Sequence, residues 1–171
     1  MRILGIDPGL RKTGFGVIEV LGNDIYYVTS GVIETNSENS IPLRLKTILS
    51  GINEIIAQHS PSIASIEQIF FNVNPKSSLL LGQARAAAIC SCVERNIEVF
   101  EYTALQVKQA ITGFGHADKT QITKMVRYIL KLDGNPQVDA ADALANAITH
   151  HYCSKSFAKL HVKSKHKERV L

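Results

Sequence analysis

The sequence predicts a single α/β domain with a mixed five-stranded sheet flanked by helices. A chain of 171 residues, 45% of them hydrophobic, is long enough to bury one sizeable core. Three strand-like runs near the N-terminus are joined by short turns, which is typical of an antiparallel meander. Strand-like and helical patterns then alternate without an internal repeat, so the expected order of elements is βββαβαβααα.

Two turn signals separate the first three expected strands. The first run stops at Pro8-Gly9, and Gly22-Asn23-Asp24 closes the second. We expect these strands at 3–7, 14–20 and 25–33.

Periodicity and capping residues place the remaining elements. Leucines and isoleucines recur at helical spacing between 45 and 56, and Ser60-Pro61 ends that helix. Asp118, with Gln121 three residues later, forms the pattern of a capping box at a helix start. The expected elements are a helix at 40–58, a strand at 62–67, a helix at 75–95, a strand at 97–101, and helices beginning at Thr103, Asp118 and Asn135, the last running to about Tyr152.

The composition excludes several classes of protein. No apolar run approaches the roughly 18 residues of a membrane span, and the first strand begins too early to leave room for a signal peptide. Cys90, Cys92 and Cys153 are odd in number and lack Cys-x-x-Cys spacing, so neither a disulfide framework nor a zinc site is expected. We therefore expect a cytoplasmic protein that does not enter a membrane.

The positive charge is concentrated at the C-terminus. The chain carries 19 basic and 15 acidic residues, and the stretch 154–171 holds six of the basic ones against Glu168 alone. The rest of the chain is thus close to neutral. We expect residues 1–153 to form the folded domain and 154–171 a basic tail. Such a tail can bind nucleic-acid phosphates; the simpler interpretation, which we predict, is a solvated and disordered end.

Four acidic residues carry the functional signal. Asp7 and Glu67 each end an apolar strand, and Asp139 and Asp142 lie three residues apart near the start of the last helix. Buried carboxylates are costly unless they are paired, hydrogen-bonded or bound to a metal. Each also has a simpler interpretation when taken alone. Asp7 could cap a turn, Glu67 could pair with a cation, and an acid at Asp139 favours the helix dipole.

The helical spacing brings Asp139 and Asp142 side by side. At 100° per residue they lie about 60° apart, at the margin of the expected apolar stripe. Two like charges so placed cost stability unless a cation lies between them. If the three segments converge, four carboxylates would hold two Mg²⁺ ions about 4 Å apart, for hydrolytic phosphoryl transfer on a phosphodiester. One ion would activate the attacking water and the other would stabilise the leaving oxygen; we expect Mn²⁺ to substitute.

Three further residues are weaker candidates. Of Phe70 and Phe71, one should face the core and the other could stack on an unpaired base. Lys119 lies in the first turn of a helix, where a cation opposes the helix dipole, and this hints at a phosphate contact. Lys108 is a weaker candidate for a phosphate contact of the same kind.

The order of these motifs resembles the RuvC family of bacterial Holliday-junction resolvases. The resemblance extends over about 1–151, and its order and spacing make it specific. It rests on the first strand with Asp7-Pro8-Gly9, the stretch 13–16, the second motif at 66–70, the start of a long helix at 81–85, and the acidic helix at 139–145.

The resemblance implies a ribonuclease-H-like fold and an endonuclease that resolves four-way DNA junctions by symmetric paired nicks, during recombination and repair. It also implies a homodimer that works with the RuvA–RuvB branch-migration complex. By the resemblance, the catalytic, metal-binding carboxylates are Asp7, Glu67, Asp139 and Asp142, the base-contacting aromatic is Phe70, and the basic residues beside the cleft are Lys108 and Lys119.

Two other classes of protein fit less well. An actin-like ATPase shares the Asp7-Pro8-Gly9 hairpin pattern but needs a second similar domain, and we expect none from 171 residues without a repeat. A catalytically silent DNA-binding module would not require four convergent acids, because carboxylates repel phosphate unless a metal intervenes.

Overall fold

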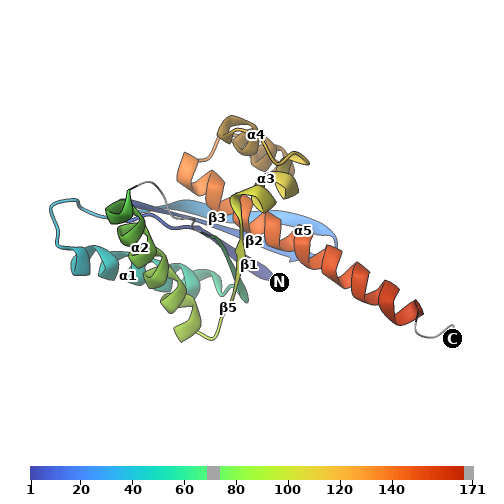
Figure 1. Cartoon of the computed structure of the whole chain (residues 1–171), viewed down its shortest axis with the longest axis horizontal. Helices are drawn as coiled ribbons and strands as arrows, with labels where there is room; N and C mark the ends of the chain where they lie inside the picture. The colour runs from blue at the N-terminus through green and yellow to red at the C-terminus, as the bar shows by residue number, and fades with distance from the viewer. Residues whose placement is uncertain (69–73, 168–171) are drawn as a thin grey trace.

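The computed structural model describes residues 1–68 and 74–167, the stretch 156–167 by its backbone alone. The elements follow one another in the expected order (Figure 1). The strands are β1 (Arg2–Asp7), β2 (Lys12–Leu21), β3 (Asp24–Glu34), β4 (Ile63–Glu67) and β5 (Glu98–Tyr102). The helices are α1 (Ile41–His59), α2 (Pro75–Glu94), α3 (Ala104–Thr112), α4 (Lys119–Leu130) and α5 (Val138–Lys167).

The strands form the predicted mixed five-stranded sheet, in the order β3-β2-β1-β4-β5. The meander of β1, β2 and β3 is antiparallel, whereas β1 with β4 and β4 with β5 are parallel. In the register between the two central strands, Ile6 pairs with Ile66. Because parallel strands end at the same edge of a sheet, the residues that follow, Asp7 and Glu67, lie side by side.

Helices cover both faces of the sheet. Helices α1 and α2 lie on one side, and α5 lies across the other with α3 and α4 packed beyond it (Figure 1). Leu4, Ile6 and Ile66 belong to the core under α1 and α2, whereas Ile3 belongs to the core under α5. Since side chains alternate along a strand, Asp7 and Glu67 face the α5 side. The sheet thus directs both acids toward the helix that carries the other two.

Glycines let α5 lie unusually close to the sheet. A Cβ atom on Gly5 would collide with the main-chain oxygen of Ala143, and one on Gly14 with that of Asp139. The helix in turn presents small side chains to β1 and β2. The first turns of α5 are therefore held directly against the strand end that carries Asp7.

The structure differs from the prediction for α5. Residues 143–151 are buried on every side, so the helix has no single apolar stripe there. This burial arises because the sheet covers one side of α5 and α3 and α4 cover the other. His150 and His151, expected near a helix end, are only 2% and 3% exposed in mid-helix.

The end of α5 was also predicted wrongly. The helix continues to Lys167 instead of ending near Tyr152. Neither glycine nor proline interrupts the chain between Val138 and Lys167, so nothing in the sequence stops the helix. The division of the chain into a nuclease domain (1–153) and a tail (154–171) stays a prediction.

Two helix starts agree with their predicted caps. Thr103 and Asp118 each form a complete capping box, with Gln106 and Gln121 as the third helical residues. Strand β2 begins at Lys12, earlier than expected, since the Thr13 hydroxyl donates to the Gly9 oxygen (2.9 Å) and closes a shorter turn. Across the described ranges, we find no helix both long and apolar enough to cross a bilayer.

Candidate active site

A cleft of about 360 Å³ opens where β1 and β4 end beside α5. Asp7 and Glu67 reach it from the two strands, and Asp142 reaches it from the second turn of α5. Lys108 of α3 and Lys119 of α4 lie on its other wall. The rest of its lining is Pro8, Gln68, Leu81, Ala104, Val107 and Ile122. Five of the seven predicted site residues therefore meet in one cleft.

Asp7 is the most perturbed carboxylate of the cleft. Burial, with repulsion from Asp142, Glu67 and Asp139, raises the pKa of Asp7 to about 7, against an opposing effect of Lys119. Such a shift arises when several carboxylates crowd one desolvated position. Asp139 is not part of the cleft lining, but its charge acts on Asp7. All four predicted acids are thus coupled electrostatically.

Glu67, Lys108 and Lys119 also interact electrostatically within the cleft. Burial and the charge of Asp142 raise the pKa of Glu67, whereas Lys119 and Lys108 lower it. The Lys119 ammonium donates to Asp142 Oδ2 at 3.2 Å, and the charge of Asp142 raises the pKa of Lys119. The Lys119 side chain is still 77% exposed. It can therefore hold Asp142 and also meet a phosphate that enters the cleft.

Local structure explains the position of Lys119. The capping box of Asp118 and Gln121 starts α4 immediately before it, so Lys119 is the first helical residue. Ile122, one turn further along, is 5% exposed and anchors α4 in the core beside the cleft. The lysine is thereby aimed toward the start of α5, at a helix end where its charge opposes the dipole.

Not every expected site residue can be placed. Phe70 lies outside the described residues, as does Phe71. Among residues that the sequence interpretation missed, Gln68 and Leu81 line the cleft. Gln68 directly follows Glu67, and Leu81 opens the stretch 81–85 that resembles the family motif, so both had a signal that pointed to the site.

The donor set agrees only partly with a Mg²⁺ site. Carboxylate oxygens are the ligands that Mg²⁺ prefers, and a cation would relieve the repulsion that, after burial, raises the pKa of Asp7. In the described part of the chain, however, no three His, Cys, Asp or Glu side chains form a cluster able to hold a metal ion. The chemistry of the residues nevertheless fits the metal, because the acids that act on Asp7 offer the oxygen ligands that Mg²⁺ prefers.

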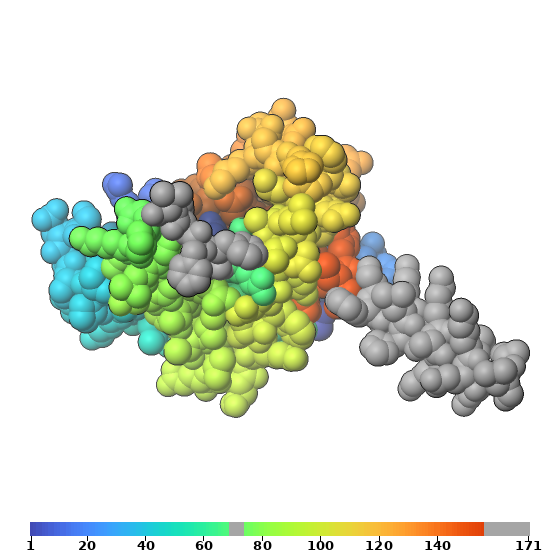
Figure 2. All heavy atoms as spheres, viewed as in Figure 1, coloured from blue at the N-terminus to red at the C-terminus, as the bar shows by residue number. Residues whose placement is uncertain are grey.

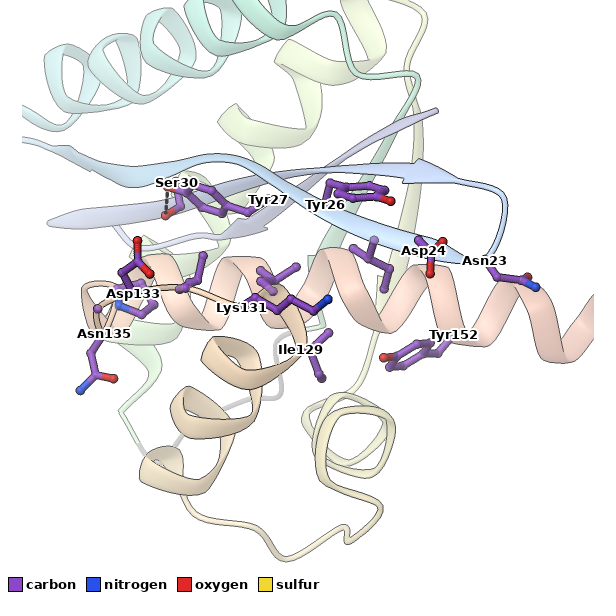
Figure 3. Close-up of a pocket in the computed structure, with 15 residues that line it drawn as sticks. Asn23, Asp24, Tyr26, Tyr27, Ser30, Ile129, Lys131, Asp133, Asn135 and Tyr152 are labelled. Atoms are coloured by element: carbon purple, nitrogen blue, oxygen red, sulfur yellow. Dashed lines mark hydrogen bonds between the residues drawn. The ribbon is translucent and has the colours of Figure 1, made fainter.

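A second groove, shown in Figure 3, lies elsewhere, between β3, the loop after α4 and the middle of α5. Its volume is about 800 Å³. Its labelled side chains include Tyr26, Tyr27 and Tyr152, and Tyr27 shares a hydrogen bond with Ser30 (3.2 Å). None of the predicted site residues that the structure describes lines it, so volume alone would point away from the candidate site.

Comparison with known proteins assigns the chain to a family. The family model described as crossover junction endodeoxyribonuclease RuvC matches residues 3–150. A relative of that name from Cupriavidus metallidurans is 58% identical over 150 residues, which cover 88% of this chain and 83% of the relative. Another from Albidiferax ferrireducens is 56% identical over 162 residues, covering 94% and 89%.

Solved structures agree with this assignment. Thermus thermophilus RuvC in complex with Holliday junction substrate matches with a TM-score of 0.86 and 32% identity, over 91% of this chain and 96% of that chain. The yeast mitochondrial Holliday junction resolvase Ydc2 shares only the fold, with a TM-score of 0.62 and 11% identity over 86% and 76%. These likenesses confirm the predicted ribonuclease-H-like fold. The chain belongs to the RuvC family of crossover junction endodeoxyribonucleases.

Proposed function

We propose that this protein is a metal-dependent endonuclease that resolves four-way DNA junctions by symmetric paired nicks, in recombination and repair. Asp7, Glu67, Asp139 and Asp142 are its catalytic, metal-binding carboxylates. The observation that carries the proposal is that Asp7 lies buried at the end of β1 with three acids around it; burial, together with their repulsion, raises the pKa of Asp7 to about 7. A cleft that only bound phosphate would place cations, not carboxylates, at this position.

The residues of the cleft divide the work between them. Asp7, Glu67 and Asp142 would offer carboxylate oxygens to Mg²⁺ from the cleft, and Asp139 would offer a further one from the preceding turn of α5. When bound there, Mg²⁺ supplies a Lewis acid and lowers the pKa of water near the scissile phosphate.

The opposite wall of the cleft meets the substrate. Lys119 neutralises part of the charge of Asp142 and turns its exposed ammonium toward the DNA backbone. Lys108 lowers the pKa of Glu67 from this wall and offers a second phosphate contact. Leu81, Val107 and Ile122 form an apolar part of the lining and exclude water. By family resemblance, Phe70 contacts a base.

The finer assignments follow from membership of the family. We expect two Mg²⁺ ions per subunit, with Mn²⁺ able to substitute, because two ions can stabilise both the attacking and the leaving oxygen. We also expect a homodimer, since two symmetric nicks require two cleavage centres. The RuvA–RuvB complex as a partner and a cytoplasmic location complete the proposal.

A cleavage assay tests this function. The protein is incubated with Mg²⁺ and either a four-way junction or a linear duplex of the same sequence, beside Asp7→Asn and the surface control Glu54→Gln. We expect paired nicks in the junction alone, lost in Asp7→Asn and retained in Glu54→Gln. Equal cutting of the linear duplex, or full activity of Asp7→Asn, would contradict the proposal.

A further inference from the structure

Arg85 bonds the main chain of Glu67, one of the proposed catalytic carboxylates. Its Nε donates to the main-chain oxygen of Glu67 at 3.3 Å, and a terminal nitrogen of the same guanidinium pairs with Glu101 Oε1. Arg85 belongs to α2 and Glu101 to β5. One side chain thus joins a helix, the end of β4 and the neighbouring strand.

The pairing lies on the face of the sheet opposite the cleft. Glu101 pairs in register with Ile66, which packs in the core under α1 and α2, so the two side chains share that face. The Glu67 carboxylate, one position along the strand, points to the other face and lines the cleft. Arg85 therefore holds the peptide of Glu67 while the carboxylate projects away from it.

Arg85 does not enter the cleft that holds the carboxylates. Its side chain is 18% exposed. The charges that shift the pKa of Glu67 come from Asp142, Lys119 and Lys108, all on the cleft side. The influence of Arg85 on Glu67 is thus one of main-chain position, through a charged donor that suits a carbonyl oxygen.

We propose that Arg85 is a positioning residue for the nuclease reaction: clamped by Glu101, it fixes the end of β4 so that the Glu67 carboxylate meets the other acids. The inference rests on the proposed function and deepens it. Glu67 is the last residue of its strand, and directly after it Gln68 N donates to the Tyr102 oxygen at 2.8 Å. The guanidinium adds a second restraint at this end.

Three variants and one control test the role. Arg85→Gln removes the guanidinium charge. Arg85→Lys keeps a positive charge, but one ammonium cannot bond the Glu67 oxygen and the Glu101 carboxylate in the same geometry. Glu101→Gln weakens the ion pair with Arg85. Arg95→Gln changes an exposed arginine next to the end of the same helix. For each variant we measure the maximal rate of junction nicking and the Mg²⁺ midpoint, which is the Mg²⁺ concentration that gives half of that rate. We also measure the junction affinity without Mg²⁺ and the melting temperature.

We expect Arg85→Gln to raise the Mg²⁺ midpoint and to lower the maximal rate about 10- to 100-fold, because small displacements of catalytic groups have effects of this size. Junction affinity should be unchanged. Arg85→Lys and Glu101→Gln should fall between Arg85→Gln and the parent, and the Arg85→Gln/Glu101→Gln double variant should be no worse than Arg85→Gln alone. Arg95→Gln should match the parent.

Two results would overturn the inference. A loss of junction affinity with an unchanged Mg²⁺ midpoint would make Arg85 a phosphate contact, and no change in any measurement would leave it without a role. If the parent itself does not nick junctions, the proposed function fails, and Mn²⁺ binding without DNA decides the matter for Arg85. Weaker Mn²⁺ binding in Arg85→Gln then supports positioning, and equal binding contradicts it. If Arg85→Gln does not fold, the same comparison is made with Arg85→Lys.

Discussion

Gly14 lies directly against the main chain of Asp139, so closely that a Cβ atom would collide with the Asp139 oxygen. The same glycine is the register partner of Asp7 across the β1–β2 ladder. One residue without a side chain therefore sets the spacing between an acid on the sheet and an acid on α5. Figure 2 shows the outer surface of the molecule, with α2 in green and α3 in yellow on the face in view.

A Gly14→Ala substitution should separate these two acids. The added methyl group must displace α5, which we expect to cost about 1–3 kcal/mol of stability and about 100-fold or more in nicking rate. Urea unfolding and the junction assay measure the two effects. Gly134→Ala is the matched control, since nothing lies within 4 Å of a Cβ there. A Gly14→Ala variant with the parent's activity would show that this contact does not set the site.

The stability of the metal-free protein should depend on pH through Asp7. Its pKa of about 7 in the fold exceeds the ordinary 3.8, so the folded state binds the proton more tightly and loses stability as pH rises from about 4 to 7. Asp7→Asn removes this loss. We expect the variant to be more stable than the parent by up to about 4 kcal/mol above pH 7, with no difference below about pH 4. Denaturant unfolding in EDTA across this range checks the sign, and a gap that widens toward low pH would contradict it.

Lys119→Gln should change both the rate and its pH dependence. The Lys119 charge lowers the pKa of Asp7 and of Glu67, so its removal raises both. If the ionised acids are the active forms, the rising limb of the pH–rate profile moves to higher pH. At neutral pH we expect a loss of about 100-fold, as for other groups that stabilise developing charge. Lys124→Gln, an exposed position on the same helix, is the control; a profile with an unchanged limb would argue against this role of Lys119.

Asn146 should stabilise the contact between α5 and the two central strands. Its side-chain nitrogen donates to the Ile6 oxygen at 3.0 Å, and its own main-chain oxygen accepts from the Ser65 hydroxyl at 2.7 Å. Because Asn146 is fully buried, Asn146→Ala leaves the Ile6 oxygen without this donor, at a cost of about 1–3 kcal/mol. Urea unfolding of this variant is compared with that of Asn135→Ala, an exposed asparagine. Equal loss in both variants would rule out the buried bond as the cause.

The sequence predicted the elements that local chemistry decides. The capping box expected at Asp118 depends on two residues three apart and is present, and the helix expected to start at Thr103 does so. The acids at Asp7 and Glu67 could be assigned because each ends an apolar strand, and parallel pairing of those strands brings them together.

Tertiary contacts decided the rest. The burial of α5 on every side depends on glycines in β1 and β2, which no helical period of α5 can reveal. The clamp at Arg85 runs to a main-chain oxygen across the sheet, and a sequence pattern carries no signal for that. The helical spacing placed Asp139 beside Asp142, but it could not show that Asp139 acts on Asp7 from outside the cleft lining.

Counting bound ions tests the central claim most directly. Free Mn²⁺ is measured by electron paramagnetic resonance while the ion is titrated into the protein with a four-way junction present. Parallel titrations use Asp7→Asn and the surface control Glu54→Gln. We expect two ions bound per subunit in the parent and in Glu54→Gln, and fewer and weaker sites in Asp7→Asn. Equal Mn²⁺ binding by Asp7→Asn and the parent would contradict a metal centre built on the four carboxylates.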